Sequence, residues 1–595
     1  QQTYWPAHVA ARSTGPLYRV EWNRLPVVDR SGSGTDDVVV SIPTSSARDV
    51  AVHTLELVQS WLTEDRADAR LVLVTRRAVA VDEREDVDPG QAAAWGLVRS
   101  AQTEQPGRLV LVDTDDPTAD LGPALATGEP QLVLRGGNVH APALAEVPQE
   151  SGTPEVLAPE GTVLITGATG GLGKLLARHL VTEYGARNLL LLSRRGPDAP
   201  GAADLQDELV RLGAVVEIEA CDVSDSDSLS RVLEGIPDER PLTAVVHAAG
   251  VIDDGTVASL TSEQVERVIR AKAEAALVLH ELTKDLDLAS FVLFSAAAGV
   301  LGGAGQANYA AANAVLDALA QHRKAHGLPA QSLAWGLWSE REGMGGRLGD
   351  ADVLRMARGG VRPLSAAQGL ALFDAARNRD EALLLPIRLD LSELAAQDRH
   401  ALAPLMRGLV RQDRPRAEQE ERPLAAELRA VTAEEQMERV LGLVRERAAF
   451  VLGHASPKHV AVEQPFSEIG FDSLTAVELR NRLNAATGLR LPATLVFDYP
   501  TPEVLAGFLL VELVGDQGEA SARSDSGAIA VAGADEPIAI VGLGCRYPGG
   551  VTDADGLWDL LESGRDTLVD FPAERGWDTA ELYHPDPDQP GRTYV

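Results

Sequence analysis

The feature that most constrains the fold is a short apolar run that passes through a glycine-rich turn directly into a helix. Val163 to Ile165 have the composition of a buried strand, TGATGGLG (166–173) supplies the turn, and KLLARHLVTEY follows with helical periodicity. Glycines permit a tight turn and the close approach of a pyrophosphate, whose charge is favoured at a helix N-terminus. A glycine cluster alone is weak evidence, but this context predicts a dinucleotide-binding unit.

Strand-like and helical runs also alternate upstream, between residues 17 and 150. LYRVEW, DVVVSIP, RLVLV (twice) and QLVLRGGNVHAPAL alternate with the helical stretches AVHTLELVQSWL and QAAAWGLVRSAQ. None of these strand-like runs is followed by a glycine fingerprint. The sequence therefore predicts two α/β units, of which the second, from about residue 151 to 397, holds the nucleotide.

The strand after the glycine turn, NLLLLSRRG, ends in Ser193, Arg194 and Arg195. An acidic residue at this point would select a ribose 2′-hydroxyl, whereas guanidinium groups favour a 2′-phosphate. We therefore expect NADPH rather than NADH. The alternative is that both arginines are merely solvated.

A candidate proton donor stands in FSAAAGVLGGAGQANYAAAN (294–313). Tyr309 and Asn313 are one helical turn apart, and the apolar run FVLF before them reads as a buried strand that ends at Ser295. Reduction of a ketone needs a proton for the developing alkoxide. A phenol can supply it if a nearby cation lowers its pKa from about 10.

Together these segments resemble the short-chain dehydrogenases, and specifically the ketoreductase domain of a modular type I polyketide synthase. The resemblance implies two Rossmann-like subdomains, the first purely structural. It also implies that Lys272, in RVIRAKAEAALVLHEL, is the cation, because this family exchanges the lysine and asparagine positions of the general family. The alternative for Lys272 is a surface helix lysine. The residues that the resemblance places at NADPH are Gly167, Thr169, Gly170, Gly171, Leu172, Gly173, Ser193, Arg194, Arg195, Asp222, Val223, Ala248, Ala249, Gly250, Lys272 and Tyr309.

One catalytic position departs from the family pattern. A hydroxyl donor is expected 13 positions before the tyrosine, where this chain has Ala296. Ser295 is one place too early, and adjacent residues of a strand point to opposite faces. Loss of one oxyanion donor typically costs about 10²- to 10³-fold in rate. Two hypotheses follow: a slow reductase, or an impaired reductase domain that acts mainly as a scaffold for a functional carrier.

Stereochemical markers depend wholly on the resemblance. VIDDG (251–255) resembles the LDD motif of B-type ketoreductases, with Ile252 for leucine and Asp254 as the marker. Leu301 replaces the tryptophan of A-type enzymes, and Ala311 lacks the proline of the B2 subtype. This implies a B1 enzyme and a D-configured hydroxyl, unless the two aspartates simply form a polar turn. Met344 is expected in a lid over the substrate.

GFDSLTAVELRNRL (470–483) opens a helix in which Ala476, Leu479 and Leu483 form an apolar stripe. A serine at a helix entrance is usually only an N-cap. However, GFDSL and the later VFDYPTPEVLAGFL closely resemble acyl carrier proteins. The resemblance implies that Ser473 carries 4′-phosphopantetheine, which tethers a β-ketoacyl chain.

The last segment, 535–595, resembles the opening of a ketosynthase. Cys545 lies in that family's N-terminal strand, whereas the family's catalytic cysteine and histidines come later, so we expect no condensing activity. The predicted fold is thus α/β, with two Rossmann-like subdomains, then a small all-α helical bundle and an incomplete thiolase-like segment. The predicted boundaries are a linker after a preceding domain at 1–16, structural subdomain 17–150, NADPH-binding subdomain 151–397, linker 398–424, carrier 425–513, flexible linker 514–534 and ketosynthase segment 535–595.

Bulk properties limit the partners. The net charge of −34 argues against nucleic acid and anionic membranes, and no apolar run approaches the roughly 20 residues of a membrane span. The two cysteines cannot make a disulfide framework, so we expect a cytoplasmic protein, and no metal site is expected. The start at Gln1 suggests a piece of a longer polypeptide. The resemblance implies neighbouring ketosynthase and acyltransferase domains and a homodimer in the intact synthase.

Overall fold

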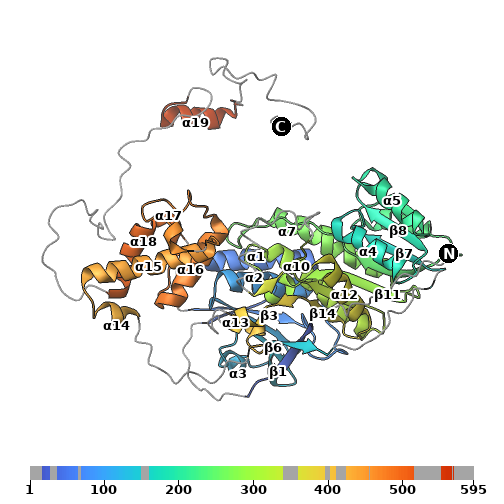
Figure 1. Ribbon diagram of the computed structural model, residues 1–595, viewed down its shortest axis with the longest axis horizontal. Coiled ribbons are helices and arrows are strands. Elements are labelled where there is room, and N and C mark those ends of the chain that lie inside the picture. Colours follow the sequence, from blue (N-terminus) through green and yellow to red (C-terminus); the bar gives the residue numbers. More distant parts are fainter. Residues whose placement is uncertain are drawn as a thin grey trace, which may run out of the picture. The chain divides into compact units, whose positions relative to one another are not determined.

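The chain forms two compact units, residues 1–516 and 517–595, in a computed structural model (Figure 1). In the second unit, α19 (Ala554–Ser563) begins after Asp553, whose side chain accepts a hydrogen bond from the Gly556 nitrogen. Met344 and Cys545, singled out from the sequence, lie outside the described residues. The structure describes residues 16–26, 37–64, 69–148, 158, 160–339, 360–395, 402–410, 424–454, 456–492, 494–514, 551–565 and 567.

Among the described residues, one 13-stranded sheet runs through both predicted α/β units. β1 joins them, because Leu17 pairs antiparallel with Val147 of β6 on one side and with Pro386 of β14 on the other. The sequence predicted the two units but not their common sheet. In spatial order the strands are β2 (Val38–Ser41), β3 (Leu71–Arg76), β4 (Leu109–Thr114), β5 (Gln131–Arg135), β6 (Asn138–Val147), β1 (Leu17–Arg24), β14 (Leu383–Pro386), β12 (Gln331–Trp335), β11 (Ser290–Ala296), β10 (Leu242–His247), β7 (Thr162–Thr166), β8 (Asn188–Ser193) and β9 (Val215–Ala220).

The run QLVLRGGNVHAPAL is a hairpin rather than one strand. Gly136 and Gly137 have φ of +52° and +77°, and Arg135 pairs antiparallel with Asn138. Two successive residues with positive φ are what a two-residue hairpin turn requires. The chain therefore reverses within a run that reads as continuous in the sequence.

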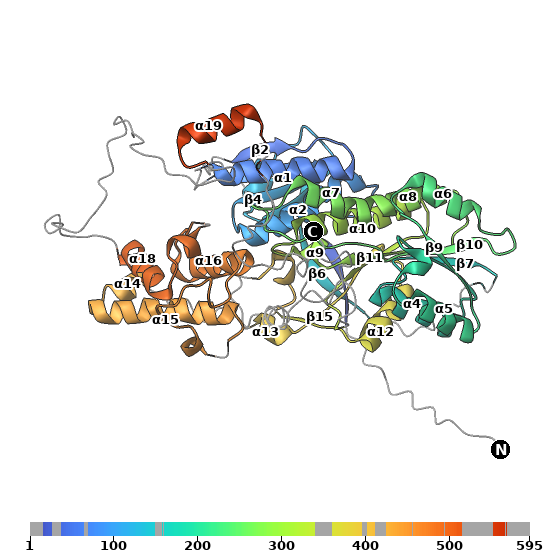
Figure 2. The same cartoon turned by 90° about the horizontal axis from the view of Figure 1, so that it is seen from above.

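Helices cover both faces of the nucleotide-binding half of the sheet (Figure 2). Alternate strand residues serve the two layers: Leu164 packs with the layer of α1, α2, α7, α8 and α10, and Val163 with that of α4, α5 and α12. β7, β8, β10 and β11 are buried along nearly their whole length, as expected for strands covered on both faces, whereas the edge strand β9 is largely exposed. The helices are α1 (Ala47–Thr63), α2 (Pro89–Glu104), α3 (Gly122–Leu125), α4 (Gly171–Thr182), α5 (Ala202–Arg211), α6 (Ser226–Glu234), α7 (Ser262–Ile269), α8 (Ala275–Thr283), α9 (Ala298–Leu301), α10 (Ala307–Ala325), α12 (Ala366–Arg377) and α13 (Leu391–Ala395).

The structural subdomain touches the helix that carries Tyr309. A Cβ on Gly96 of α2 would lie 2.1 Å from the Ala310 carbonyl oxygen of α10, so only glycine allows this approach. The first α/β unit therefore fixes the position of α10 although it has no glycine fingerprint of its own.

The reductase core extends past residue 397. Leu402, Leu405 and Met406 are buried against Tyr18 and Leu144, although the sequence places them in a linker. These apolar side chains cover the middle of the sheet, where β1 lies between β6 and β14. The described tail includes the short 3₁₀ helix η4 (Pro404–Met406).

Residues 424–514 form a helical bundle with a core of its own. Leu479 and Leu483 of the predicted stripe are fully buried there, and Ala476 is 5% exposed. The all-α prediction for this segment is confirmed. Its elements are α14 (Leu424–Leu428), α15 (Ala433–Val451), η5 (Pro457–His459), α16 (Ser473–Thr487), α17 (Leu495–Asp498) and α18 (Pro502–Val514).

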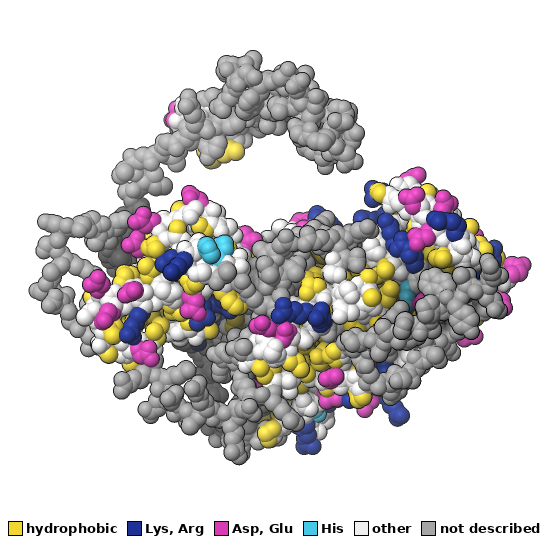
Figure 3. Space-filling model, viewed as in Figure 1, with side chains coloured by type: hydrophobic (Ala, Val, Ile, Leu, Met, Phe, Trp, Pro, Cys, Tyr) yellow, Lys and Arg dark blue, Asp and Glu magenta, His cyan; other side chains and the backbone are white. Residues whose placement is uncertain are grey.

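On the face drawn in Figure 3, hydrophobic, basic and acidic side chains of the described residues lie interspersed. Within the described part of the chain, no helix combines the length and the apolar character needed to cross a membrane.

Candidate active site

The glycine turn between β7 and α4 leaves space that side chains would fill. Gly167 has φ of +68°, and a Cβ there would lie 2.8 Å from the Ala249 nitrogen. A Cβ on Gly173 would lie 2.3 Å from the Gly167 carbonyl oxygen. Because α4 begins at Gly171, the unpaired N–H groups and positive dipole end of this helix border the same space. The loop thus fits a pyrophosphate that approaches the backbone closely.

The end of β8 offers an unsatisfied polar group beside this turn. The Ser193 hydroxyl oxygen is buried and has no hydrogen-bond partner among the described residues. Arg194 and Arg195 follow it, both exposed, and all three line the cleft. A phosphate offers three acceptor oxygens, which a hydroxyl and two guanidinium groups can satisfy. The residues present therefore fit the 2′-phosphate of NADPH.

Lys272 lies inside the protein, so the alternative of a surface lysine is wrong. It is 2% exposed and belongs to the π-helical segment η2 (Arg270–Glu274). Its Nζ donates to the Phe294 carbonyl at 2.9 Å and lies 5.4 Å from the centroid of the Tyr309 ring. Burial lowers the pKa of Lys272 to about 8, against the attraction of the Asp317 carboxylate.

Tyr309 lies in the first turn of α10. Desolvation raises the pKa of Tyr309 to about 12, a hydrogen bond with Asn313 opposes this, and the charge of Asp254 adds to it. The sequence predicted that a nearby cation would lower this pKa. The opposite holds because burial of the phenol outweighs the contacts that lower its pKa. The phenol is thus protonated at neutral pH and holds a proton to donate.

β11 continues through Ala296 rather than ending at Ser295. Ala296 pairs with Trp335 of β12, so the two neighbours keep the alternation of a strand. Ser295 is 3% exposed, and its hydroxyl donates to the Asn313 carbonyl at 3.3 Å. Ala296 is partly exposed and lines the cleft. The hydroxyl of Ser295 is therefore committed elsewhere, and Ala296 brings none.

Two polar residues follow Tyr309 at successive turns of α10. The Asn313 side-chain amide donates to the Tyr309 carbonyl at 2.7 Å, and Asn313 does not line the cleft. Asp317 accepts from the Ser332 hydroxyl at 2.6 Å, and burial raises the pKa of Asp317 to about 6. Asp317 was not predicted from the sequence, although its spacing of four residues from Asn313 was a signal.

His247 was missed as well. It is fully buried, with Nδ1 2.8 Å from the Thr166 hydroxyl and Nε2 2.9 Å from the Lys272 carbonyl. Burial lowers the pKa of His247 to about 3, so the ring stays neutral. It links the strand before the glycine turn to the segment that holds Lys272. A lone histidine in the apolar run VVHAAG was the available signal.

The two aspartates of VIDDG have different surroundings. Asp253 accepts from the Gln264 side chain at 3.0 Å and pairs with Arg267. Asp254 accepts from the Gln306 side chain at 3.1 Å and lines the cleft. Asp253 thus pairs with side chains of α7, whereas Asp254 borders the cleft. Leu301 also lines the cleft, whereas Ala311 is buried within the α10 packing.

Ser473 is the first residue of α16, and Asp472 takes the N-cap position. The Asp472 carboxylate accepts from the Thr475 nitrogen at 2.8 Å. The N-cap alternative for Ser473 is therefore wrong. Its side chain is exposed at a helix N-terminus, which favours a phosphodiester.

One cleft of about 2890 Å³ gathers nearly all the predicted site residues. Asn313 is the exception, because it does not line the cleft and its side-chain amide donates to the Tyr309 carbonyl. The cleft is lined by Gly167, Thr169, Gly170, Gly171, Leu172, Gly173, Ser193, Arg194, Arg195, Asp222, Val223, Ala248, Ala249, Gly250, Asp254, Lys272, Ser295, Ala296, Tyr309 and Ser473.

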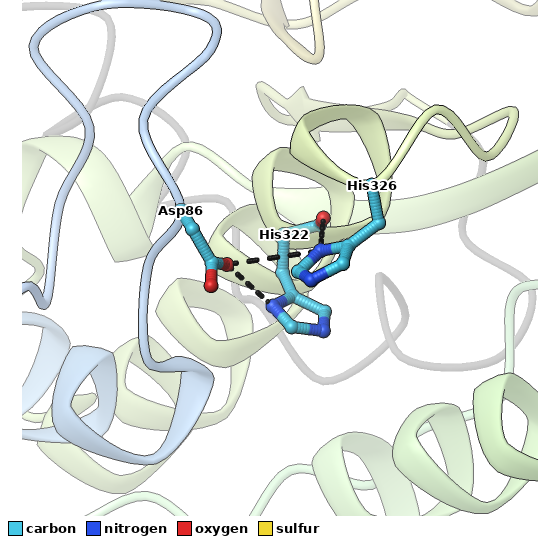
Figure 4. A group of neighbouring side chains, drawn as sticks. All are labelled: Asp86, His322 and His326. Carbon is cyan, nitrogen blue, oxygen red and sulfur yellow. Dashed lines mark hydrogen bonds and ion pairs between the residues drawn. The ribbon is translucent and has the colours of Figure 1, made fainter.

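A separate group of metal-ligand types, Asp86, His322 and His326, does not line this cleft (Figure 4). His322 Nδ1 lies 2.8 Å from the Asp86 carboxylate, and His326 Nδ1 lies 2.9 Å from the His322 carbonyl. The ligand atoms thus already have partners. We interpret the group as a polar link between the structural subdomain and α10.

Four family profiles match four successive segments of the chain. Residues 5–144 match the Rossmann fold domain of the polyketide synthase extender module SpnB, and residues 161–340 match the KR domain. Residues 442–509 match the phosphopantetheine attachment site, and residues 535–595 match the N-terminal domain of beta-ketoacyl synthases.

The matched relatives are synthases much longer than this chain. The chain is 52% identical, over 89% of its length, to the spectinabilin polyketide synthase system protein NorA′ of Streptomyces orinoci, and spans 15% of that protein. It is 51% identical, over 73% of its length, to the mycoketide-CoA synthase of Mycobacterium tuberculosis, and spans 10% of it. It therefore corresponds to a small part of each.

Solved ketoreductases share the fold of the reductase part of the first unit. A structure of A-type ketoreductases from a modular polyketide synthase is 34% identical, with a TM-score of 0.55, over 64% of this chain and 94% of that one. The KR fold implies the use of NADPH, and the attachment-site profile implies 4′-phosphopantetheine. Four matched segments in order, with a solved ketoreductase matched over nearly its whole length, show that this chain belongs to the modular polyketide synthases, with a ketoreductase, a carrier domain and the start of a ketosynthase.

Proposed function

We propose that the chain reduces a β-ketoacyl thioester, held on phosphopantetheine at Ser473, to the β-hydroxyacyl thioester. The observation that carries the proposal is the common cleft, which Lys272, Tyr309 and Ser473 all line. Tethering at Ser473 raises the local substrate concentration to about the millimolar range, so weak contacts between domains suffice.

Each residue has a distinct part in this reaction. NADPH, when bound, supplies the hydride to the carbonyl carbon. Tyr309 donates its phenolic proton to the oxygen as the alkoxide forms, and the Lys272 ammonium favours the resulting phenolate. Asn313 fixes the turn of α10 that carries Tyr309, since it donates to the Tyr309 carbonyl.

Ala296 supports two versions of the proposal. No hydroxyl at this strand position reaches the substrate oxygen, and the Ser295 hydroxyl donates to the Asn313 carbonyl instead. A slow reductase is the first version. The second is an impaired reductase domain that serves as a scaffold for the carrier, and the missing hydroxyl is the observation that favours it.

We further infer B1-type stereochemistry, with a D-configured hydroxyl and no epimerisation. Asp254 supports this, because it lines the cleft and is held by Gln306. The solved relative named above is A-type, so the assignment depends on the motif residues of this chain.

The decisive experiment follows NADPH oxidation with a β-ketoacyl thioester and then determines the configuration of the alcohol. Oxidation with a D-alcohol is the expected result. An L-alcohol would reject the B1 assignment, and cofactor binding without oxidation would favour the scaffold.

The pH dependence of reduction tests the part of Lys272. Its pKa of about 8 means that the ammonium is present below pH 8 and is lost as the pH rises through that value. Tyr309, with a pKa of about 12, keeps its proton over the same interval. We expect log kcat/KM to be flat from pH 6.5 to about 8 and then to fall with a slope near −1. A rise between pH 8 and 9.5 would contradict the role of Lys272 as the cation.

For the intact synthase we propose a cytoplasmic homodimer in which this segment follows an acyltransferase and precedes a complete ketosynthase. We place the domain boundaries as the sequence suggests, except that the reductase extends to about residue 410, because Leu402 and Leu405 belong to its core.

A further inference from the structure

The carrier domain contacts the structural subdomain at one defined place, the C-terminal end of α2. The Arg480 guanidinium of α16 donates to the Glu104 carbonyl, and the Asn481 side-chain amide donates to the Thr103 and Glu104 carbonyls at 3.1 and 3.2 Å. Arg480 is 4% exposed although it stands on the outside of the carrier core. The bond from Arg480 to the Glu104 carbonyl is therefore shielded from water.

The chemistry of the contact suits both partners. The last carbonyls of a helix have no partner within the helix, and they carry the negative end of its dipole. A guanidinium placed there satisfies an acceptor and complements the charge. The Glu104 carboxylate adds a further attraction for Arg480. The C-terminal end of α2 thus binds the cationic side chain of Arg480, which lies on α16.

Glu104 also holds two loops of the catalytic cleft. Its carboxylate accepts from the Gly305 nitrogen at 2.9 Å and from the Val257 nitrogen at 2.8 Å. Gly305 precedes the helix of Tyr309, and Val257 follows the VIDDG turn. Glu104 is 1% exposed, so these bonds are shielded from water. Glu104 therefore contacts the carrier through its backbone carbonyl and positions the cleft walls through its side chain.

A second contact lies beside the attachment serine. A Cβ built on Gly305 would lie 3.5 Å from Leu474, which follows Ser473 in α16. Leu474 thus rests on the loop that Glu104 holds, and Ser473 lines the catalytic cleft. The two contacts are six residues apart on α16 and together set the orientation in which Ser473 faces the cleft.

From these contacts we propose that the end of α2 and the Gly305 loop form the docking site for this chain's own carrier domain. Arg480, Asn481 and Leu474 are the carrier residues that recognise it, and Glu104 is a positioning residue that joins the docking surface to the cleft walls. The inference deepens the proposed function, because docking presents the tethered β-ketoacyl group to Tyr309.

The test compares tethered with free substrate in the full-length Ala296→Ser chain. Ser473 is loaded from a β-ketoacyl-CoA by a phosphopantetheinyl transferase, and one turnover is followed by NADPH fluorescence. We expect Arg480→Ala to slow tethered reduction about tenfold and to leave reduction of a free β-ketoacyl thioester within twofold. Arg439→Ala is the matched control, because Arg439 is an exposed arginine of α15 in the same domain. Equal tethered rates for the two variants would overturn the docking site.

Folding and the proposed reduction are controlled separately. Both arginine variants are expected to accept phosphopantetheine at Ser473 as the parent chain does, which reports a folded carrier. Amide hydrogen exchange of residues 303–306 gives a readout that needs no reduction: Arg480→Ala is expected to speed it and Arg439→Ala to leave it unchanged. If neither free nor tethered substrate is reduced by any variant, the proposed function fails. In that case exchange alone judges the docking site, which fails if Arg480→Ala leaves the exchange of residues 303–306 unchanged.

A mixing experiment tests whether the carrier acts within its own chain. Ser473→Ala chains, which lack the tether, are mixed with loaded Tyr309→Phe chains, which lack the proton donor. We expect no reduction at concentrations where the parent chain turns over. Reduction at the parent rate would assign the docking to a second copy and overturn the proposal.

Discussion

Replacement of Ala296 by serine is expected to raise the rate of NADPH-dependent reduction by at least about tenfold. If the new hydroxyl acts as a full oxyanion donor, the expected rise is about 10²- to 10³-fold. The reason is geometric, because Ala296 lines the cleft and occupies a regular strand position paired with Trp335. A hydroxyl there can donate to the developing alkoxide, and removal of one such donor typically costs about 10²- to 10³-fold. The measurement is kcat with a β-ketoacyl thioester at saturating NADPH.

Ala297→Ser is the matched control for this change. Ala297 is the next residue, also lines the cleft, and is 8% exposed. It begins the turn into α9, so a hydroxyl there is expected to leave the rate within about twofold of the parent. Equal rates for Ala296→Ser and the parent chain would show that the missing hydroxyl does not limit this reductase.

Replacement of Tyr309 by phenylalanine in the Ala296→Ser chain is expected to lower the rate about 10²- to 10⁴-fold, the usual range for loss of a positioned proton donor. The phenyl ring keeps the place of the tyrosine ring, 5.4 Å from the Lys272 ammonium, but brings no proton. NADPH consumption in single turnovers measures the loss.

The same variant should still bind NADPH, because the glycine turn and the run Ser193–Arg195 are unchanged, and it should accept phosphopantetheine, because α16 is unchanged. Fluorescence titration and mass measurement check the two. A Tyr309→Phe rate within threefold of its parent would assign the proton donor to another group.

Much of the site could be predicted because its parts are local in sequence. The glycine turn, the Ser193–Arg195 run and the Tyr309–Asn313 pair are each short motifs whose residue types state their chemistry. The common cleft confirms that these segments come together. The alternation of Ser295 and Ala296 was also predictable, because a strand leaves no freedom in side-chain direction.

Other features depend on contacts between distant residues and left little trace in the chain. The pKa of Tyr309 rises rather than falls, because the fold buries its phenol and so disfavours the phenolate. Glu104 reads as one more surface charge near the end of a helix, yet it is 1% exposed and bonded to residues about 150 and 200 positions away. Every residue type has the same backbone groups, so hydrogen bonds to backbone atoms cannot be predicted from the residues that contribute them.

The junction at β1 has a practical consequence for exchanging reductases between synthases. β1 starts at Leu17 but lies between β6 and β14, which ends at Pro386, so the two halves of the sheet are joined by strands more than 350 residues apart in the sequence. A graft cut at the glycine turn would keep β12 beside β14 but remove β1 from its other side, and it would leave α10 without α2, the helix that packs on it at Gly96. Splice points before residue 17 and after residue 410 are expected to give soluble chimeras. Splice points at the subdomain boundary near residue 150 are expected to give insoluble chimeras.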